Sequence, residues 1–242
     1  MPPVANAFPS PSAWSQNNSR AEVQELLDFD DGNKVTYRGP GIDDSDAVTV
    51  RANHPVPRNA GIYYFEVDIV DKGREGFIGV GFCGAGVNMA RLPGWENHSY
   101  GYHGDDGHRF ESDGRGTAYG PVFTTGDVVG CVLNFTDRTI SFTKNGTELG
   151  VAFENVREEV LYPCVGVRTP GESIRANFSG PFKADFNEMK AEAVRKVVSG
   201  IANVPVPAAK LPRILNSLVL SHLQHMGYSE SAAAVARDMA GE

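Results

Sequence analysis

The chain has 242 residues, a net charge of −8 and a hydrophobic fraction of 41%. This length and composition allow one large domain with a sizeable core, or such a domain with a small appendage. The excess of acidic residues argues against a nucleic-acid or anionic-membrane binder, because both need clustered Lys and Arg. No apolar run is long enough to cross a bilayer.

Residues 1–29 are predicted to be a disordered leader, because residues 1–20 are rich in Pro, Ser, Asn and Ala and contain no hydrophobic signal core. The cysteines are Cys83, Cys131 and Cys164. An odd number of cysteines in apolar runs does not indicate a disulfide framework. We therefore expect reduced, buried thiols in a cytoplasmic or nuclear protein.

Residues 30–182 alternate apolar and polar residues in short runs, which Gly, Pro, Asn and Asp separate, and the domain is assigned to residues 30–186. This spacing predicts an antiparallel β-sandwich. Asn145-Gly146 predicts a two-residue hairpin turn, since both residues tolerate a positive φ. The expected strands are residues 35–37, 47–50, 62–69, 77–82, 100–102, 127–135, 139–143, 161–167 and 173–178.

The pattern becomes helical after residue 186. Residues 187–201 are helix formers, and the prolines of residues 203–209 make a linker, so that residues 187–210 form a helix with a Pro-containing linker. Residues 211–242 then predict two short helices, with a cap at Ser229. An apolar stripe runs along the first of them, made by Leu211, Ile214, Leu215, Leu218, Val219 and Leu223. Helices this short need a partner to bury such a stripe.

The sandwich resembles a SPRY domain over residues 39–182. The runs that carry the resemblance are YYFEV at 63–67, GVG at 79–81, SYGY at 99–102, GDVVGC at 126–131, FTKNG at 142–146 and LYP at 161–163. The runs LPGW at 92–95 and HSYGYHGDDGH at 98–108 are similar to those of the Ran-binding protein M (RanBPM) subgroup.

Residues 211–242 resemble a LisH motif, through Leu215, Leu218, Val219, Leu223, Gly227-Tyr228 and Ala232. LisH motifs often have an aromatic residue near the position of Val235, so this one is expected to pack less tightly. SPRY followed by LisH is the order found in RanBPM-like proteins, which continue into further helical domains called CTLH and CRA.

The resemblance implies a mainly β fold, with a SPRY-type antiparallel β-sandwich at residues 30–186 and a small all-α LisH motif. It also implies an adaptor or scaffold without catalytic activity, which binds short peptide segments of partner proteins and joins a GID/CTLH-type ubiquitin-ligase assembly. The LisH motif is expected to form a homodimer through Leu215, Leu218, Val219, Leu223 and Tyr228.

The peptide is expected on loops, because connecting segments lie on the surface and carry function. Trp95 allows two interpretations, which we weigh equally: it contacts the ligand at the rim of the binding site, or it covers the edge of the sandwich. The 168–171 turn corresponds to a loop that lines the ligand face in SPRY domains. The expected contacts are Arg51, His54, Pro55, Met89, Leu92, Trp95, Tyr100, Tyr102, Arg168, Thr169 and Pro170.

Other chemistries have weaker support. His103, Asp105, Asp106 and His108 have the spacing of metal ligands, but Asp-Asp-Gly is also ordinary turn chemistry. We expect no metal, no cofactor and no catalytic residue, since a G-x-S-x-G elbow is missing from the sequence. The alternative function is a lectin-like, carbohydrate-binding sandwich.

Overall fold

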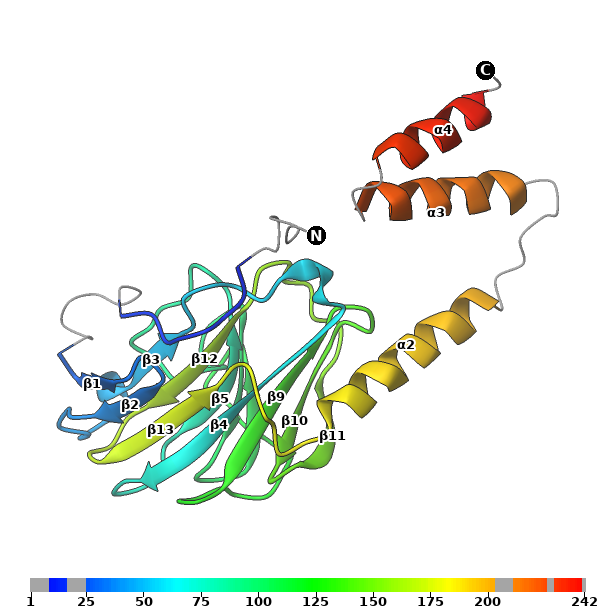
Figure 1. The fold of residues 1–242 in the computed structure, drawn as a ribbon. Helices are drawn as coiled ribbons and strands as arrows, with labels where there is room; N and C mark the ends of the chain where they lie inside the picture. The colour runs from blue at the N-terminus through cyan, green and yellow to red at the C-terminus, as the bar shows by residue number, and fades with distance from the viewer. Residues whose placement is uncertain (1–8, 17–24, 203–210, 226–228, 241–242) are drawn as a thin grey trace. The chain divides into compact units, whose positions relative to one another are not determined.

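The computed structural model describes residues 9–16, 25–202, 211–225 and 229–240. The chain divides into two compact units, Phe8–Ala193 and a helical unit that begins at Val194. The first unit is a sandwich of two antiparallel sheets (Figure 1). The prediction of a mainly β fold with an antiparallel sandwich is confirmed.

The larger sheet has seven strands in the order β1-β2-β13-β4-β9-β10-β11. Their bounds are β1 Leu27–Asp30, β2 Lys34–Tyr37, β13 Glu172–Asn177, β4 Ile62–Lys72, β9 Val128–Asn134, β10 Thr139–Lys144 and β11 Thr147–Phe153. The smaller sheet has six strands in the order β3-β12-β5-β6-β7-β8. Their bounds are β3 Val48–Arg51, β12 Tyr162–Val167, β5 Gly79–Cys83, β6 Ser99–His103, β7 His108–Glu111 and β8 Thr117–Ala118.

The core lies between the two sheets because strand side chains alternate between faces. On β4, Phe65, Val67 and Ile69 point inward and are buried. The Phe65 ring meets the ring of Phe82 on β5 edge to face, with the centroids 5.5 Å apart. Tyr64 on the opposite face of β4 belongs to a separate, smaller cluster.

The predicted hairpin turn is confirmed. Lys144 pairs with Thr147, and Asn145 and Gly146 have φ values of 53° and 87°. Positive φ at both central residues is the geometry that joins two twisted strands through two residues.

The prediction of a disordered leader over residues 1–29 is wrong for part of that range. Trp14 is only 3% exposed, forms a bridge to Ala52 and packs its ring against Phe178 at 5.1 Å. Residues from Leu27 onward form β1, an edge strand. A single tryptophan among polar residues has no periodic signal, so only its distant partners show that it is ordered.

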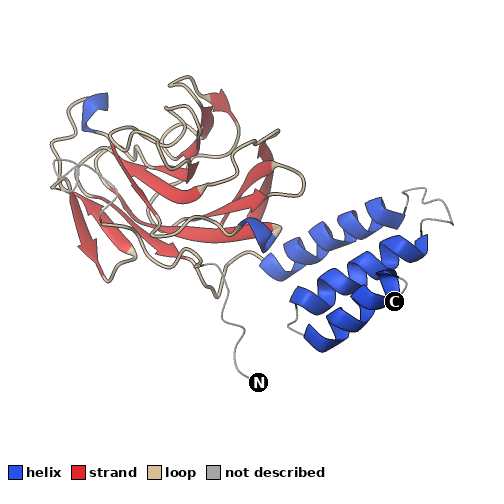
Figure 2. Cartoon of the chain, turned by 90° about the horizontal axis from the view of Figure 1, so that it is seen from above, coloured by secondary structure: helices blue, strands red, loops and turns tan. Residues whose placement is uncertain are grey.

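The helices are concentrated near the C-terminus, as the blue ribbons in Figure 2 show. They are α2 Phe186–Ala202, α3 Leu211–His225 and α4 Ser229–Ala240; the short 3₁₀ turns η1 Asp44–Asp46 and η2 Arg58–Ala60 lie in loops. None of the described helices is long and apolar enough to span a membrane. The proline linker falls outside the described residues.

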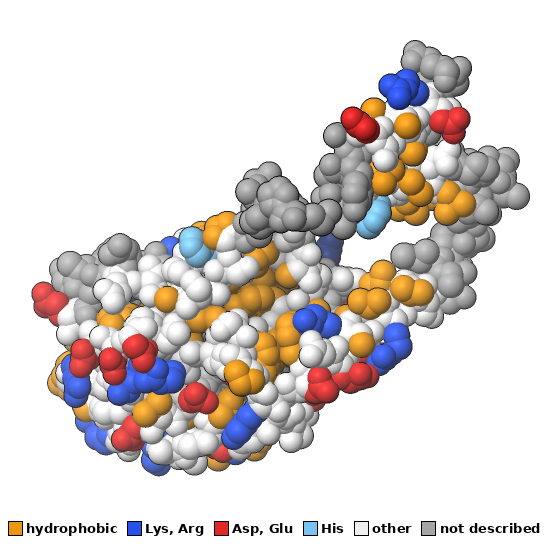
Figure 3. Space-filling model, in the orientation of Figure 1, with side chains coloured by type: hydrophobic (Ala, Val, Ile, Leu, Met, Phe, Trp, Pro, Cys, Tyr) orange, Lys and Arg blue, Asp and Glu red, His pale blue; other side chains and the backbone are white. Residues whose placement is uncertain are grey.

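The apolar stripe expected on α3 is exposed within the helical unit. Leu218 is 62% exposed and Leu215 is 50% exposed, while Ala232 of α4 is buried. Hydrophobic side chains, in orange, are visible along these helices in Figure 3. Tyr228, which was also expected in the interface, lies outside the described residues.

Candidate functional site

The predicted peptide-binding residues divide between two ends of the smaller sheet. Arg51 pairs with Cys164 near the start of β12, whereas Arg168 directly follows its last residue, Val167. Tyr162 and Arg168 are six residues apart, and a strand rises about 3.3 Å per residue, so the ends are about 20 Å apart. We call them the Arg51 end, with Arg51, His54, Pro55 and Tyr162, and the Arg168 end, with Arg168, Thr169 and Pro170.

Arg168 already has partners within the chain. Its guanidinium lies 3.6 Å from the ring centroid of Phe77, forms an ion pair with Asp44 and lies 3.8 Å from a carboxylate oxygen of Glu75. Its side chain is only 14% exposed. The guanidinium therefore links its own turn to the loop of Asp44 and to the loop of Glu75 and Phe77. Only a small part of the Arg168 side chain is exposed to a ligand.

Thr169 is fully buried and does not reach the surface, contrary to expectation. Its hydroxyl donates to Glu172 Oε1 at 2.5 Å, and the amides of Arg168 and Thr169 donate to Glu172 Oε2 at 2.6 and 2.9 Å. Burial raises the pKa of Glu172, although these donors oppose the shift. Thr169 and Glu172 therefore stabilise the 168–171 turn through buried hydrogen bonds.

The neighbouring loop at the Arg168 end is packed tightly against this turn. A Cβ on Gly41 would lie 2.6 Å from Pro170 Cδ, and Gly41 has a φ of +61°. The Arg74 guanidinium donates to the Gly41 carbonyl, and the Arg74 amide donates to the Pro170 carbonyl at 3.2 Å. Ile42, beside Gly41, is 80% exposed.

Sequence reasoning missed Ile42, Asp44, Glu75 and Phe77. A lone apolar residue in the acidic, Gly-containing run at 41–46 was the available signal for Ile42. The other three are recognisable only from their contacts with Arg168.

A long loop, residues 84–98, crosses the outer face of the smaller sheet. The Thr49 amide donates to the Met89 carbonyl at 2.7 Å. Met89 and Leu92 are 7% and 1% exposed, so they anchor this crossing loop and are not available to a ligand. Apolar side chains in a loop are here explained by packing on the sheet.

Glycines on three adjacent strands make room for the crossing loop. Gly166 of β12, Gly79 of β5 and Gly101 of β6 lie under Pro93. A Cβ on Gly101 would lie 2.1 Å from the Pro93 oxygen. Any larger residue in this trough would push the crossing loop away.

Trp95 follows Pro93 and is half-buried. Arg91 stacks on its ring at 5.1 Å, and the His103 ring lies 6.1 Å away. The indole therefore packs on the sheet and also presents part of its surface; a role for Trp95 in binding stays a prediction.

His103 is not part of a metal-ligand cluster within the described residues. Its Nε2–H donates to the Pro93 carbonyl at 2.8 Å, and its ring stacks on Phe110 with centroids 4.0 Å apart. His108 instead contacts Asp106 at 3.1 Å. The histidines of the 103–108 run thus have separate structural roles.

The two tyrosines of β6 are also buried. Tyr102 is fully buried in the core, where its hydroxyl donates to the Pro121 carbonyl. It therefore does not reach a surface ligand, contrary to the expectation that it contacts the peptide. Tyr100 is 5% exposed, and its hydroxyl donates to Glu158 at 2.6 Å. Both tyrosines are at even positions of β6, so the two-residue period turns both rings inward.

At the Arg51 end the polar groups are engaged with neighbouring loops. The Arg51 guanidinium lies 4.6 Å from the Tyr162 ring centroid and donates to the Ala85 carbonyl at 2.6 Å. His98 contacts Glu158 at 2.8 Å. Burial opposes ionisation of Glu158, but hydrogen bonds from Tyr100 and His98 outweigh it and lower its pKa.

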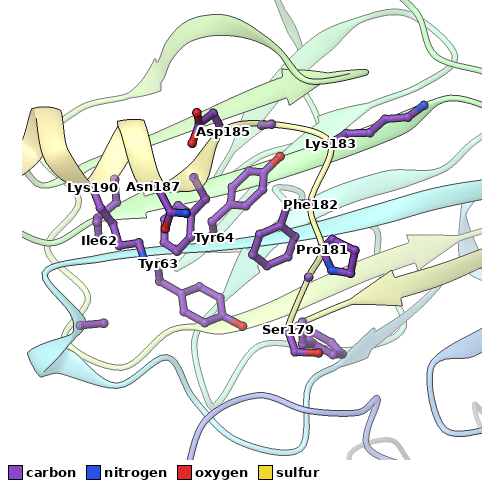
Figure 4. Close-up of a pocket in the computed structure, with 15 residues that line it drawn as sticks. Ile62, Tyr63, Tyr64, Ser179, Pro181, Phe182, Lys183, Asp185, Asn187 and Lys190 are labelled. Carbon is purple, nitrogen blue, oxygen red and sulfur yellow. The ribbon is translucent and has the colours of Figure 1, made fainter.

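A groove of about 870 Å³ lies where β4 begins and α2 starts (Figure 4). The rings of Tyr64 and Phe182 lie together there, 5.0 Å apart, while Tyr63 lies on the other side of β4. Glu66 Oε1 accepts hydrogen bonds from the amides of Lys183 and Ala184 at 2.8 and 3.1 Å. These hydrogen bonds hold the segment before α2 against the larger sheet, so the residues around the groove serve to attach this segment.

Comparison with known proteins matches this architecture. Residues 62–181 match the SPRY domain family model, and residues 215–238 match the LisH model. A crystal structure of a human SPRY domain superposes with a TM-score of 0.58 at 29% identity, covering 65% of this chain and 98% of that one. The SPRY domain of human HERC1, at 24% identity and a TM-score of 0.57, shares the fold, over 70% of this chain and 99% of that one.

The chain is therefore a SPRY-domain protein with a LisH motif. It is of the RanBPM-like type: Ran-binding protein 10 of Danio rerio is 47% identical over 95% of this chain and 38% of its own length. Human Ran-binding protein 9 is 46% identical over 95% of this chain and 31% of its own length. The Ran-binding protein M homolog of Arabidopsis thaliana is 36% identical over 83% of this chain and 42% of its own length. The chain thus spans less than half of the length of these relatives.

Proposed function

We propose that this chain is an interaction adaptor whose SPRY domain binds a short peptide of a partner protein at the Arg168 end. Family and fold are those of SPRY-type interaction domains, which favours an adaptor over the carbohydrate-binding alternative. The observation that carries the choice of site is the set of loops tied together at this end, where Ile42 is 80% exposed next to Gly41, which packs against Pro170.

A rigid surface favours binding because little entropy is lost when a ligand meets it. The turn at 168–171 is held by Glu172, and the 41–46 loop is held by the Asp46 carboxylate, which accepts from the Ile42 amide at 2.6 Å. Ile42 offers an exposed apolar contact, and the carboxylates of Asp44 and Glu75 lie at the same end, where they contact Arg168. This combination suits a peptide with an apolar residue and a basic or polar neighbour.

The exposed stripe on α3 would pair two copies of the chain through the LisH motif. Symmetric two-fold pairing buries one patch on both sides and doubles the number of peptide sites in the assembly. By resemblance, such a dimer would serve as a scaffold in a GID/CTLH-type ubiquitin-ligase assembly in the cytoplasm or nucleus.

The test compares captured partners of the full chain with those of the Ile42→Glu variant. Val151→Glu is the matched control, because Val151 is 52% exposed on β11 of the other sheet. We expect Ile42→Glu to lose a set of partners that Val151→Glu retains, and synthetic peptides from those partners to bind the wild-type chain. Unchanged capture by Ile42→Glu contradicts the site, and selective binding on a glycan array contradicts the peptide function.

A further inference from the structure

A second hollow lies at the other end of the sandwich from Arg168, and it is lined by arginines from three separate segments. Arg58 belongs to η2, Arg138 to the turn between β9 and β10, and Arg157 to the loop between β11 and β12. The hollow has a volume of about 370 Å³, which suits a side chain rather than an extended peptide. We call it the basic hollow; its other lining residues are Leu133, Asn134, Phe135, Val156, Glu158 and Glu159.

The carboxylates in the basic hollow are already engaged. Glu158 accepts from Tyr100 at 2.6 Å and contacts His98 at 2.8 Å. Glu159 forms an ion pair with Arg58 at 3.0 Å. Both carboxylates therefore have partners within the protein, and that of Glu159 is paired with a cation.

The lining has three arginines and two glutamates, so one positive charge is in excess there. Among the residues that the structure describes, neither Arg138 nor Arg157 forms an ion pair, and both are exposed. The chain as a whole is acidic, with a net charge of −8. A local excess of arginine on an acidic protein selects a negatively charged ligand, because guanidinium groups match carboxylate and phosphate oxygens in pairs.

The base of the basic hollow is apolar. Leu133 is 1% exposed and Val156 is 6% exposed, and Phe135 is partly buried against the core. An anion that also has a carbon body can therefore contact both the arginines and the base. A small inorganic ion would contact the arginines but not the apolar base.

The backbone that presents the arginines is held in place. The Val156 amide donates to the Arg138 carbonyl at 3.0 Å, and the Phe135 amide donates to the Gly61 carbonyl at 2.9 Å. These bonds join the three segments that contribute the arginines. The hollow is thus present before a ligand arrives, which lowers the entropic cost of binding.

We propose that the basic hollow binds an anionic side chain, phosphorylated or acidic, on a segment of a partner protein. This site is independent of the peptide site at the Arg168 end, and it gives the domain a second contact with partners. The basic hollow would thus select a ligand with negative charge, and the Arg168 end would select a peptide with an apolar residue and a basic or polar neighbour.

The test uses ¹⁵N-labelled full chain titrated with phenyl phosphate, benzoate and phenol, followed by NMR. These probes share a ring and differ in charge. We expect phenyl phosphate or benzoate to shift the signals of Arg138, Arg157 and Phe135, and phenol to shift them at least tenfold less at the same concentration. Tighter binding of phenyl phosphate than of benzoate would indicate a phosphorylated natural side chain, and the reverse would indicate an acidic one.

Arg138→Glu and Arg157→Glu should each weaken anion binding about tenfold. Arg115→Glu makes the same change of charge in the loop between β7 and β8 and should leave binding unchanged. Both Arg138 and Arg157 are exposed, so the variants should fold, and their spectra check this directly. The proposal is overturned by equal weakening in Arg115→Glu, by equal binding of phenol, or by shifts that map elsewhere.

Discussion

His103 is a fully buried histidine that the fold keeps neutral. Burial lowers its pKa from 6.5 to about 4, although the hydrogen bond with Pro93 and the charge of Asp106 oppose this shift. The unfolded chain takes up a proton at the ordinary pKa, whereas the folded chain does so only near pH 4. His103 therefore stabilises the fold above about pH 6.5, and this contribution is lost as the pH falls toward 4.

We predict that His103→Gln removes this dependence on pH. Glutamine can still donate to the Pro93 carbonyl but does not titrate. Between pH 7 and pH 4, the free energy of unfolding should fall by about 3 kcal/mol less in the variant than in the wild type. Asp105, whose pKa is raised to about 6 by burial and by Asp106, acts in the opposite sense in both proteins and cancels in the comparison. Urea unfolding at a series of pH values measures the difference, and parallel curves would contradict it.

Arg168 is expected to be a structural residue as well as a neighbour of the ligand. Arg168→Ala removes the stacking on Phe77 and the ion pair with Asp44, and should cost about 1–2 kcal/mol of unfolding free energy. Arg115→Ala, at an exposed site, should cost less than about 0.5 kcal/mol. Urea midpoints of the two variants decide the matter, and equal midpoints would show that the contacts of Arg168 contribute nothing.

The crossing loop depends on the glycine trough beneath it. We predict that Gly101→Ala destabilises the sandwich by about 2–3 kcal/mol, because the new methyl group would overlap the Pro93 carbonyl. Gly114→Ala is the control, since a Cβ there has no heavy atom within 4 Å. Hydrogen exchange should quicken for the amides of residues 84–98 in Gly101→Ala alone. Unchanged exchange in that loop would mean that Pro93 does not hold it.

Local sequence signals identified some elements and missed others. The hairpin at Asn145-Gly146 and the long β4 have strong turn and strand patterns, so they were predicted. β7 and β8 are short and lie at the edge of the smaller sheet, where polar residues are tolerated on both faces, so alternation is weak.

For the whole chain, we predict a homodimer through the LisH helices. Ile214, Leu215, Leu218 and Val219 are 41–62% exposed on one face of α3. Burying one such side chain is worth about 1.5–3 kcal/mol, which is enough for several of them to overcome the entropy of association. Light scattering should give a dimer for the full chain at micromolar concentration and a monomer for a chain that ends at Ala202.

Leu218→Asp should make the full chain monomeric, because an unpaired carboxylate is costly in an apolar interface. Ser217→Asp adds the same charge to α3 away from the apolar stripe and should leave the dimer intact. The sandwich should unfold with the same urea midpoint in both variants. A monomeric wild type, or a dimer that survives without residues 203–242, would disprove the model.

The sequence by itself determined the class of fold, the hairpin and the helical C-terminal part, because these depend on residue period and turn chemistry within short windows. It also determined the SPRY and LisH identities, through ordered motifs. Only the tertiary structure decided that Trp14 belongs to the core, that Tyr102 is out of reach of a ligand, and that Arg51 and Arg168 lie at opposite ends. Such facts depend on pairs of residues far apart in the chain: Arg168 and Asp44 are 124 positions apart. No local pattern encodes such a contact, because it forms only when the strands between the two residues have taken their places in the sheets.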